Sequence, residues 1–308
     1  ACEGSPGYAF LQADIGDRLA LAALFARHQP DVVAHLAAES HVDRSITGPA
    51  DFIRTNIVGT ASLLEAAHAY WARLPGERRE RFRFLQVSTD EVFGTLGPDA
   101  PPFSEASPYA PRSPYAASKA AGDHLARAWA ETYGLPVIVT NGCNTYGPWQ
   151  YPEKLIPLVL ARALAGAALP VYGDGRQVRT WLHVEDHAAA LAMVLEQGAV
   201  GGTYLIGSRE ERQNIDLVQR LCALLDTRLP GGAPHARLIA HVTDRPGHDR
   251  RYAVDSGRLE QTLSWQPRWP LEQGLAACVD WYLAHRDWWQ PRLAAAASPY
   301  TTVGRAAE

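Results

Sequence analysis

Strand-like and helix-like segments alternate along the first half of the chain, and this order restricts the fold more than any other feature. Apolar spacing predicts helices over residues 17–29, 56–73 and 114–133, and short apolar runs predict strands over 31–38, 82–88 and 135–141. A helix between two strands implies a right-handed crossover, which makes the strands parallel. We therefore predict an α/β fold with a doubly wound, Rossmann-like parallel sheet, whose ligands bind at the carboxyl ends of the strands.

The sequence changes character after residue 146, where turns become frequent and segments shorter. Glycine-containing turns at 147–148 and 173–175 accompany short strands predicted over 169–172 and 202–207 and helices predicted over 185–197 and 214–228. We predict three regions along the chain. Residues 1–146 form the Rossmann-like domain, 147–293 form mainly a smaller α+β substrate-binding part with some segments returning to the first domain, and 294–308 form a flexible tail.

The composition excludes several classes of protein. The net charge is -4 and the sequence pI is about 6.3, which leaves no basic excess for nucleic acid. No apolar run approaches the roughly 18 residues of a membrane-spanning helix, and no signal-peptide pattern is present. The four cysteines lie far apart without a CxxC pair, which favours a reducing compartment over a disulfide framework. We expect a cytoplasmic protein that binds neither nucleic acid nor membrane.

One histidine pair has a spacing that could hold a metal ion. His183 and His187 stand four residues apart near the start of a predicted helix. The string HVEDH differs from the zinc motif HExxH, and no string with a third ligand accompanies it. We therefore expect no metal site.

Tyr115 and Lys119 stand four residues apart at the start of the helix predicted over 114–133, so their side chains share one helix face. An ammonium beside a phenol favours the phenolate and lowers the tyrosine pKa from about 10. Such a tyrosine can take a proton from a sugar hydroxyl while a hydride leaves the same carbon. Alone, the spacing is equally compatible with a surface pair, so its meaning depends on the surrounding sequence.

Three polar residues follow the strand predicted over 82–88, at the edge where such a sheet binds its ligand. Thr89 can hydrogen-bond the same sugar hydroxyl as the tyrosine. Asp90 and Glu91 supply two adjacent carboxyls, and crowding separates the pKa values of two such groups, leaving one protonated and one ionised. The pair predicts a general acid and a general base, and a solvated Asp-Glu turn is the alternative interpretation.

Six strings occur in order over nearly the whole chain: HLAAESHVDRSI (35–46), STDEVFG (88–94), SPYAASKA (113–120), PEKLIP (152–157), VYGDGRQVRTWLHVEDH (171–187) and DRPGHDRRYAVD (244–255). Together they resemble the strings of the dTDP-glucose 4,6-dehydratases, a family of the extended short-chain dehydrogenase/reductases. The resemblance implies NAD as the cofactor, dTDP-glucose as the substrate and dTDP-4-keto-6-deoxyglucose as the product.

The resemblance also implies a role for each candidate catalytic residue. Tyr115, aided by Lys119 and Thr89, acts as the base while NAD oxidises the sugar at C4. Glu91 then removes the C5 proton, Asp90 protonates the departing C6 hydroxyl, and the hydride returns to C6. An epimerase of the same broad fold needs no acid–base pair for loss of water, so Asp90 and Glu91 distinguish the two reactions.

The same strings imply binding residues for both ligands. Positions that match cofactor contacts are Asp14, Ile15, Leu36, Ala37, Ala38, Glu39, Ser40, Thr55, Tyr115, Lys119 and Thr145. Positions that match nucleotide-sugar contacts are Ser40, Thr89, Asn144, Lys154, Leu155, Pro170, Val171, Tyr172, Arg179, Asn214, His248, Asp249, Arg250, Arg251 and Tyr252. The arginines offer charge-assisted hydrogen bonds to a diphosphate. The tyrosines at 172 and 252 can stack on a base or cover a sugar.

Two departures from the family pattern stand out. A member of the family would carry a glycine-rich βα unit and a second strand ahead of Gly7, a stretch of roughly 30 residues or more, and the printed sequence does not contain it. Either the printed sequence omits a real N-terminus, or the chain is a truncated product with weak NAD binding and exposed sheet edges. In addition, Thr145 stands where the family has asparagine, and a hydroxyl cannot replace both the amide donor and the amide acceptor.

Three functions stay open from the sequence. The first is an NAD-using lyase that acts on dTDP-glucose, which Asp90 and Glu91 favour. The second is a nucleotide-sugar epimerase or decarboxylase of the same superfamily. The third is a form that binds nucleotide-sugar without turnover, which the missing glycine-rich turn keeps open. The resemblance further implies a homodimer in which the helices predicted over 56–73 and 114–133 pair with their copies.

Overall fold

The computed structural model describes residues 4–295, so the predicted tail lies almost entirely outside the described residues. The central sheet has four parallel strands, in the order β1 (Val32–His35), β2 (Arg83–Thr89), β3 (Val137–Gly142) and β7 (Thr203–Ile206). Thr89 pairs with Gly142, so β2 and β3 end side by side. Strand β7 returns to this sheet from the second half of the sequence. The predicted α/β class with a parallel sheet is confirmed.

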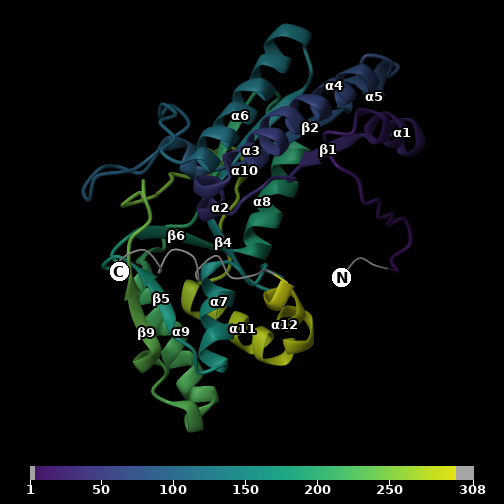
Figure 1. Ribbon diagram of the computed structural model, residues 1–308. Helices are drawn as coiled ribbons and strands as arrows, with labels where there is room; N and C mark the ends of the chain where they lie inside the picture. Colours follow the sequence, from purple (N-terminus) through teal and green to yellow (C-terminus); the bar gives the residue numbers. More distant parts are fainter. Residues whose placement is uncertain (1–3, 296–308) are drawn as a thin grey trace.

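Helices cover both faces of the sheet (Figure 1). Successive side chains of a strand point to opposite faces, and on β2 the fully buried Phe84 and Leu85 do so. The Phe84 face packs against three helices, α1 (Arg18–His28), α4 (Thr60–Trp71) and α6 (Pro114–Tyr133). The Leu85 face packs against two helices, α8 (Val184–Gln197) and α10 (Gly257–Leu263).

Helix α6 begins and ends where the sequence predicts. The Ser113 hydroxyl accepts a hydrogen bond from the Ala116 amide at 3.0 Å, and Pro114 occupies the first helical position. Gly134 ends the helix in the left-handed region, with φ of 73°. Although α6 has 20 residues, it is amphipathic, and no helix within residues 4–295 has the length and apolarity needed to cross a bilayer.

The helix predicted over 56–73 begins earlier and is irregular. Helix α3 (Pro49–Phe52) continues into a π-helical segment, η1 (Ile53–Gly59), and α4 follows. The side chain of Asn56 accepts from the Glu39 amide and donates to the Glu39 carbonyl, both at 2.9 Å. It also donates to the Ser118 hydroxyl at 2.8 Å. These distant partners favour the wider π turn, and the local sequence pattern does not reveal them.

The residues after β3, apart from segments such as β7, α8 and α10 that return to the central sheet, form a second part with its own hydrophobic core. One sheet contains β4 (Asn144–Tyr146), β6 (Val178–His183) and β8 (Glu211–Gln213), and another contains β5 (Leu169–Tyr172) and β9 (Ile239–Val242). The core is formed with α7 (Leu155–Leu164), α9 (Asn214–Arg228), α11 (Leu271–Ala284) and α12 (Arg286–Ala295). The remaining short helices are α2 (Val42–Thr47), α5 (Gly76–Arg81), η2 (Asp90–Phe93), η3 (Pro230–Gly232) and η4 (His235–Leu238).

Candidate active site

The start of α6 places a phenol and an ammonium against the end of β2. The cap at Ser113 fixes the first turn, so Tyr115 and Lys119 lie one turn apart and both are buried. The Lys119 ammonium donates to the Val87 carbonyl at 2.8 Å. The predicted pair is therefore held in the protein interior at the carboxyl end of β2, which is where ligands of such sheets bind.

Burial acts on the pKa values of both groups in opposite directions. Burial and the nearby Glu91 carboxyl raise the pKa of Tyr115, while a hydrogen bond with Thr89 lowers it. Burial lowers the pKa of Lys119, while attraction to Asp123 raises it. The Tyr115 phenol is therefore neutral near pH 7.

Two carboxyls follow β2 in the short helix η2. The Thr89 hydroxyl accepts from the Glu91 amide and donates to the Asp90 carboxyl, both at 3.3 Å. Burial and the neighbouring Glu91 raise the pKa of Asp90 to about 8, so this carboxyl is protonated at neutral pH. Burial also raises the pKa of Glu91, but attraction to Arg245 and Arg179 lowers it. Burial thus raises the pKa of both carboxyls, and Glu91 differs from Asp90 in its attraction to Arg245.

A cavity beside Glu91 collects most of the predicted nucleotide-sugar residues. It lies between α2 and the second part of the chain. The predicted residues that line it are Ser40, Asn144, Lys154, Leu155, Pro170, Val171, Tyr172, Arg179, Asn214, His248 and Tyr252. Arg179 is buried and its guanidinium lies over the Tyr252 ring, 4.1 Å from the centroid. Two asparagines and several cations suit this cavity to an anionic, hydroxyl-rich ligand.

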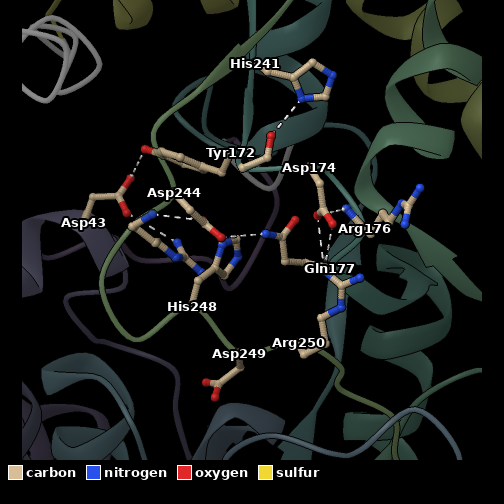
Figure 2. A network of polar contacts seen from close by, with 12 residues as sticks. Asp43, Tyr172, Asp174, Arg176, Gln177, His241, Asp244, His248, Asp249 and Arg250 are labelled. Carbon is tan, nitrogen blue, oxygen red and sulfur yellow. Dashed lines mark hydrogen bonds and ion pairs between the residues drawn. The ribbon is translucent and has the colours of Figure 1, made fainter.

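Sequence reasoning missed several residues of this cavity, among them Arg245 and Asp43. The Asp43 carboxyl accepts from the Tyr172 hydroxyl at 2.9 Å and from Arg245 at 3.4 Å (Figure 2). These contacts join α2 to β5 and to the segment after β9. Both residues belong to strings that resemble the family, so the strings contained the signal, but strings alone do not show which side chains face the cavity.

Four predicted substrate residues lie outside the cavity lining: Thr89 at the end of β2, and Asp249, Arg250 and Arg251. Arg250 forms an ion pair with Asp174 at 3.2 Å (Figure 2), and Arg251 forms an ion pair with Glu211 at 2.7 Å. Asp249 is buried and accepts hydrogen bonds from the Tyr252 hydroxyl and from Arg112. The structure therefore brings Arg245, and not the adjacent pair Arg250–Arg251, to the cavity.

A second hollow, near the carboxyl end of β1, gathers predicted cofactor residues. Asp14, Ile15, Ala37 and Thr55 line it together with residues 12–13. The side chain of Asn56 holds both backbone groups of Glu39, which fixes the loop containing the predicted residues Leu36, Ala38 and Ser40. A carboxylate, a hydroxyl and an apolar wall at this edge fit the adenosine part of a dinucleotide.

Thr145, another predicted cofactor residue, lies on β4. Its hydroxyl is hydrogen-bonded to His187 Nδ1 at 2.6 Å. Burial lowers the pKa of His187 to about 4, so the ring is neutral. His183, the other member of the predicted pair, packs against the Trp269 ring at 4.4 Å between centroids. Among the residues that the structure describes, no group of three possible metal ligands occurs.

Both lysines of the printed sequence belong to the site. Lys119 lies below Tyr115, and Lys154 lines the cavity beside Glu91. The Lys154 ammonium donates to the Ser40 carbonyl at 2.7 Å and to its hydroxyl at 3.2 Å. Burial lowers the pKa of Lys154, while attraction to Glu153 and Glu91 raises it.

Comparison with known proteins relates this site to one family. Residues 2–278 match the family described as GDP-mannose 4,6 dehydratase. A dTDP-glucose 4,6-dehydratase from Xanthomonas campestris pv. campestris (strain B100) is 58% identical over 290 residues, which cover 94% of this chain and 82% of that protein.

Solved structures agree with this relationship. A dTDP-glucose 4,6-dehydratase from Streptomyces venezuelae, with NAD and dTDP bound, superposes with a TM-score of 0.85 at 43% identity and covers 94% of this chain and 84% of that one. The UDP-glucose 4-epimerase of Thermus thermophilus, in complex with NAD, has a TM-score of 0.80 at 27% identity, covering 91% and 86%. The two structures share one fold, so the fold alone does not decide between dehydration and epimerisation.

Proposed function

Because the chain belongs to the dTDP-glucose 4,6-dehydratase family of the extended short-chain dehydrogenase/reductases, we propose that it converts dTDP-glucose to dTDP-4-keto-6-deoxyglucose with the side chains described above. The observation that carries this proposal is the pair Asp90 and Glu91. The two carboxyls are adjacent and lie beside Tyr115, and attraction to Arg245 opposes the rise that burial causes in the pKa of Glu91.

Tyr115 is the base for the first step. It accepts the proton of the C4 hydroxyl, and the Lys119 ammonium stabilises the phenolate that must form beforehand. Thr89, whose hydroxyl interacts with the phenol, orients the same C4 hydroxyl. Bound NAD would supply the hydride acceptor for C4 and the hydride donor for C6. Asp14, Ile15, Leu36, Ala37, Ala38, Glu39, Ser40, Thr55 and Thr145 would hold it.

Asp90 and Glu91 remove water from the oxidised sugar. The C4 ketone acidifies the C5 proton, which Glu91 accepts, while Asp90 gives its proton to the C6 hydroxyl that departs as water. Arg179 and Arg245 favour the ionised form of Glu91, and burial keeps Asp90 protonated. An epimerase or a decarboxylase has no use for this acid–base pair.

The cations of the cavity suit the diphosphate of the nucleotide-sugar. Lys154, Arg179 and Arg245 lie around the cavity and offer charge-assisted hydrogen bonds. Tyr172 supplies an aromatic wall, and Asn144 supplies an amide that can donate and accept. Diphosphate binding in this cavity would leave the sugar close to Glu91.

Mass spectrometry of the nucleotide-sugar tests the proposed reaction. The purified chain is incubated with dTDP-glucose and NAD, and the expected product has lost one water without net reduction of the cofactor. A product of unchanged mass but altered configuration at C4 would identify an epimerase. Unaltered dTDP-glucose with a folded chain that binds dTDP would identify a form that binds without turnover.

We also propose that the chain forms a homodimer through α4, α6 and the π-helical segment η1. Ile53 and Val58 of η1 are 51% and 54% exposed, and Tyr133 at the end of α6 is 50% exposed. These apolar side chains suit helix pairing between two copies. We expect Val58→Glu to convert a dimer into a monomer, measured by light scattering after size-exclusion chromatography. Glu260→Lys on α10, outside these helices, where Glu260 pairs with Arg209, is a charge-changing control.

The cytoplasm is the proposed location. Cys143, Cys222 and Cys278 are free and buried. Unpaired thiols are typical of proteins in a reducing compartment. Fractionation of the source cells, followed by immunodetection in the cytoplasmic fraction, tests this assignment.

A further inference from the structure

A third ionisable residue, Asp123, continues the stripe that Tyr115 and Lys119 form along one face of α6. Asp123 stands four residues after Lys119, so the three side chains share one helix face. Asp123 is completely buried. A carboxyl in this position is costly unless hydrogen bonds and an opposite charge compensate its burial, so its surroundings indicate what it does.

Neutral donors surround the Asp123 carboxyl. Its Oδ2 atom accepts from the Tyr109 hydroxyl at 2.9 Å and from Asn141 Nδ2 at 3.3 Å, and its Oδ1 atom accepts from Gln86 Nε2 at 3.4 Å. A carboxylate can use these donors only as an acceptor, so the arrangement fits the ionised form. Strands β2 and β3 therefore both contribute to holding a negative charge behind Lys119.

Asn141 connects this carboxyl to the catalytic segment. Besides Asp123, Asn141 Nδ2 contacts the Thr89 carbonyl oxygen at 3.2 Å. Thr89 is followed directly by Asp90. The Asp123 carboxyl thus contacts, through one side chain, the backbone from which Thr89, Asp90 and Glu91 project.

Among the described residues, few charged groups act on Asp123 and Lys119. Burial raises the pKa of Asp123 and lowers that of Lys119, and the attraction between the two groups opposes both shifts. Arg127, one turn further along α6, donates to the Tyr109 hydroxyl at 2.9 Å and also lowers the pKa of Asp123. His35 on β1 is neutral, because burial and Lys119 lower its pKa to about 4.

We propose that Asp123 is a positioning residue of the reaction: its buried carboxylate keeps the Lys119 ammonium charged beneath Tyr115 and fixes, through Asn141, the backbone at Thr89. This inference rests on the proposed function. It adds a residue that touches neither substrate nor cofactor. A proton shared by Tyr115 and Lys119 can leave them as phenolate and ammonium or as neutral phenol and amine. The Asp123 carboxylate lies on the lysine side, so it attracts the ammonium more than it repels the phenolate and favours the charged form.

The pH profile of turnover tests this role. Loss of a nearby negative charge lowers the pKa of both Tyr115 and Lys119. We therefore expect both limbs of the kcat/KM profile of Asp123→Asn to move to lower pH, by about one pH unit, with a reduced maximum. Asp123→Glu keeps the charge and should keep both limbs where the unsubstituted chain has them. Asp123→Ser, which leaves room for a water, is the second uncharged variant if Asp123→Asn does not fold.

Asp186→Asn is the matched control. Asp186 is also a buried carboxylate, and it accepts from the backbone amides of Arg268 and Trp269, both at 3.0 Å. Its replacement removes a buried charge and its hydrogen bonds but does not touch the stripe on α6. We expect lower stability and unchanged limbs of the pH profile.

Lysine NMR supplies a measurement that does not depend on activity. The printed sequence contains two lysines, so labelling with 13Cε-lysine gives two side-chain signals, and Lys154→Arg assigns them. We expect the Lys119 signal of Asp123→Asn to titrate at lower pH than that of the unsubstituted chain. Unmoved limbs and an unmoved Lys119 titration in both uncharged variants would overturn the proposal. Absence of turnover in the unsubstituted chain would instead overturn the proposed function.

Discussion

At the scale of single residues, the proposed roles separate into two stages that can be measured apart. Tyr115→Phe removes the base of the first oxidation, so we expect reduction of bound NAD to fall by about 10²- to 10⁴-fold. Asp90→Asn and Glu91→Gln leave Tyr115 in place, so cofactor reduction should persist while loss of water stops. Single-turnover absorbance of the reduced cofactor, combined with mass spectrometry of the sugar nucleotide, distinguishes the stages. Equal loss of cofactor reduction in all three variants would contradict these roles.

The buried acid also affects stability. The Asp90 carboxyl titrates at about pH 8 in the folded chain and at about pH 4 when unfolded. Between these values the folded chain binds one more proton, so its free energy of unfolding falls as pH rises from about 4 to about 8. We expect Asp90→Asn to reduce this fall by about 3–4 kcal/mol between about pH 5 and about pH 8. Urea unfolding at about pH 5 and about pH 8 measures it, and an equally steep fall in the variant would disprove it.

The sequence predicts which residues belong to the site better than it predicts where their side chains point. The spacing of Tyr115 and Lys119 and the position of Asp90 and Glu91 after a strand both follow from local rules, and the structure brings these residues together. Which arginine faces the cavity does not follow from such rules. Arg250 and Arg251 have acidic partners, Asp174 and Glu211, on distant strands and turns, and only the folded chain reveals those partners.

At the scale of elements, the ends of α6 were predictable and the π turn was not. A hydroxyl cap, a proline at the first turn and a glycine at the end are signals within the element itself. The π-helical segment η1 depends on Asn56, whose partners are Glu39 and Ser118 on other elements. An element shaped by such contacts carries no local periodicity that would indicate it.

Asn56→Ala should therefore weaken the cofactor loop more than the rest of the fold. The substitution leaves both backbone groups of Glu39 without their side-chain partner. We expect the free energy of unfolding to fall by about 2–3 kcal/mol and the affinity for NAD to fall with it. Calorimetric titration with NAD and urea unfolding measure the two effects. Glu77→Ala on the exposed first turn of α5 is the control. Equal NAD affinity of the Asn56→Ala variant and the unsubstituted chain would contradict this role.

At the scale of the whole molecule, α2 joins the sheet domain to the second part of the chain. Asp43 contacts Tyr172 and Arg245, Arg44 pairs with Glu153 at 2.7 Å, and Lys154 donates to the backbone of residue 40. These contacts border the cavity beside Glu91. The cavity shape therefore depends on how α2 is held, which neither half of the sequence could predict alone.

Asp43→Ala tests this arrangement. The variant loses the acceptor for Tyr172 and for Arg245, but it touches no reacting atom. We expect KM for dTDP-glucose to rise about tenfold, while kcat changes by less than about threefold. Asp51→Ala is the control. It removes the exposed ion pair between Asp51 on α3 and Arg54 on η1, and it should leave both constants unchanged. A fall in kcat without a change in KM would show that Asp43 acts on chemistry and not on substrate binding.

The placement of both lysines has a practical consequence for anyone who modifies this protein. Reagents that acylate amines react with the neutral form, and burial lowers the pKa of the Lys154 side chain that lines the cavity. The other positive side chains of the printed sequence are arginine and histidine, so an amine-reactive dye added near neutral pH would attach mainly to the N-terminal amine and to Lys154 in the cavity. The rate of attachment to Lys154, followed by peptide mapping, would then report occupancy of the cavity, and dTDP would slow it.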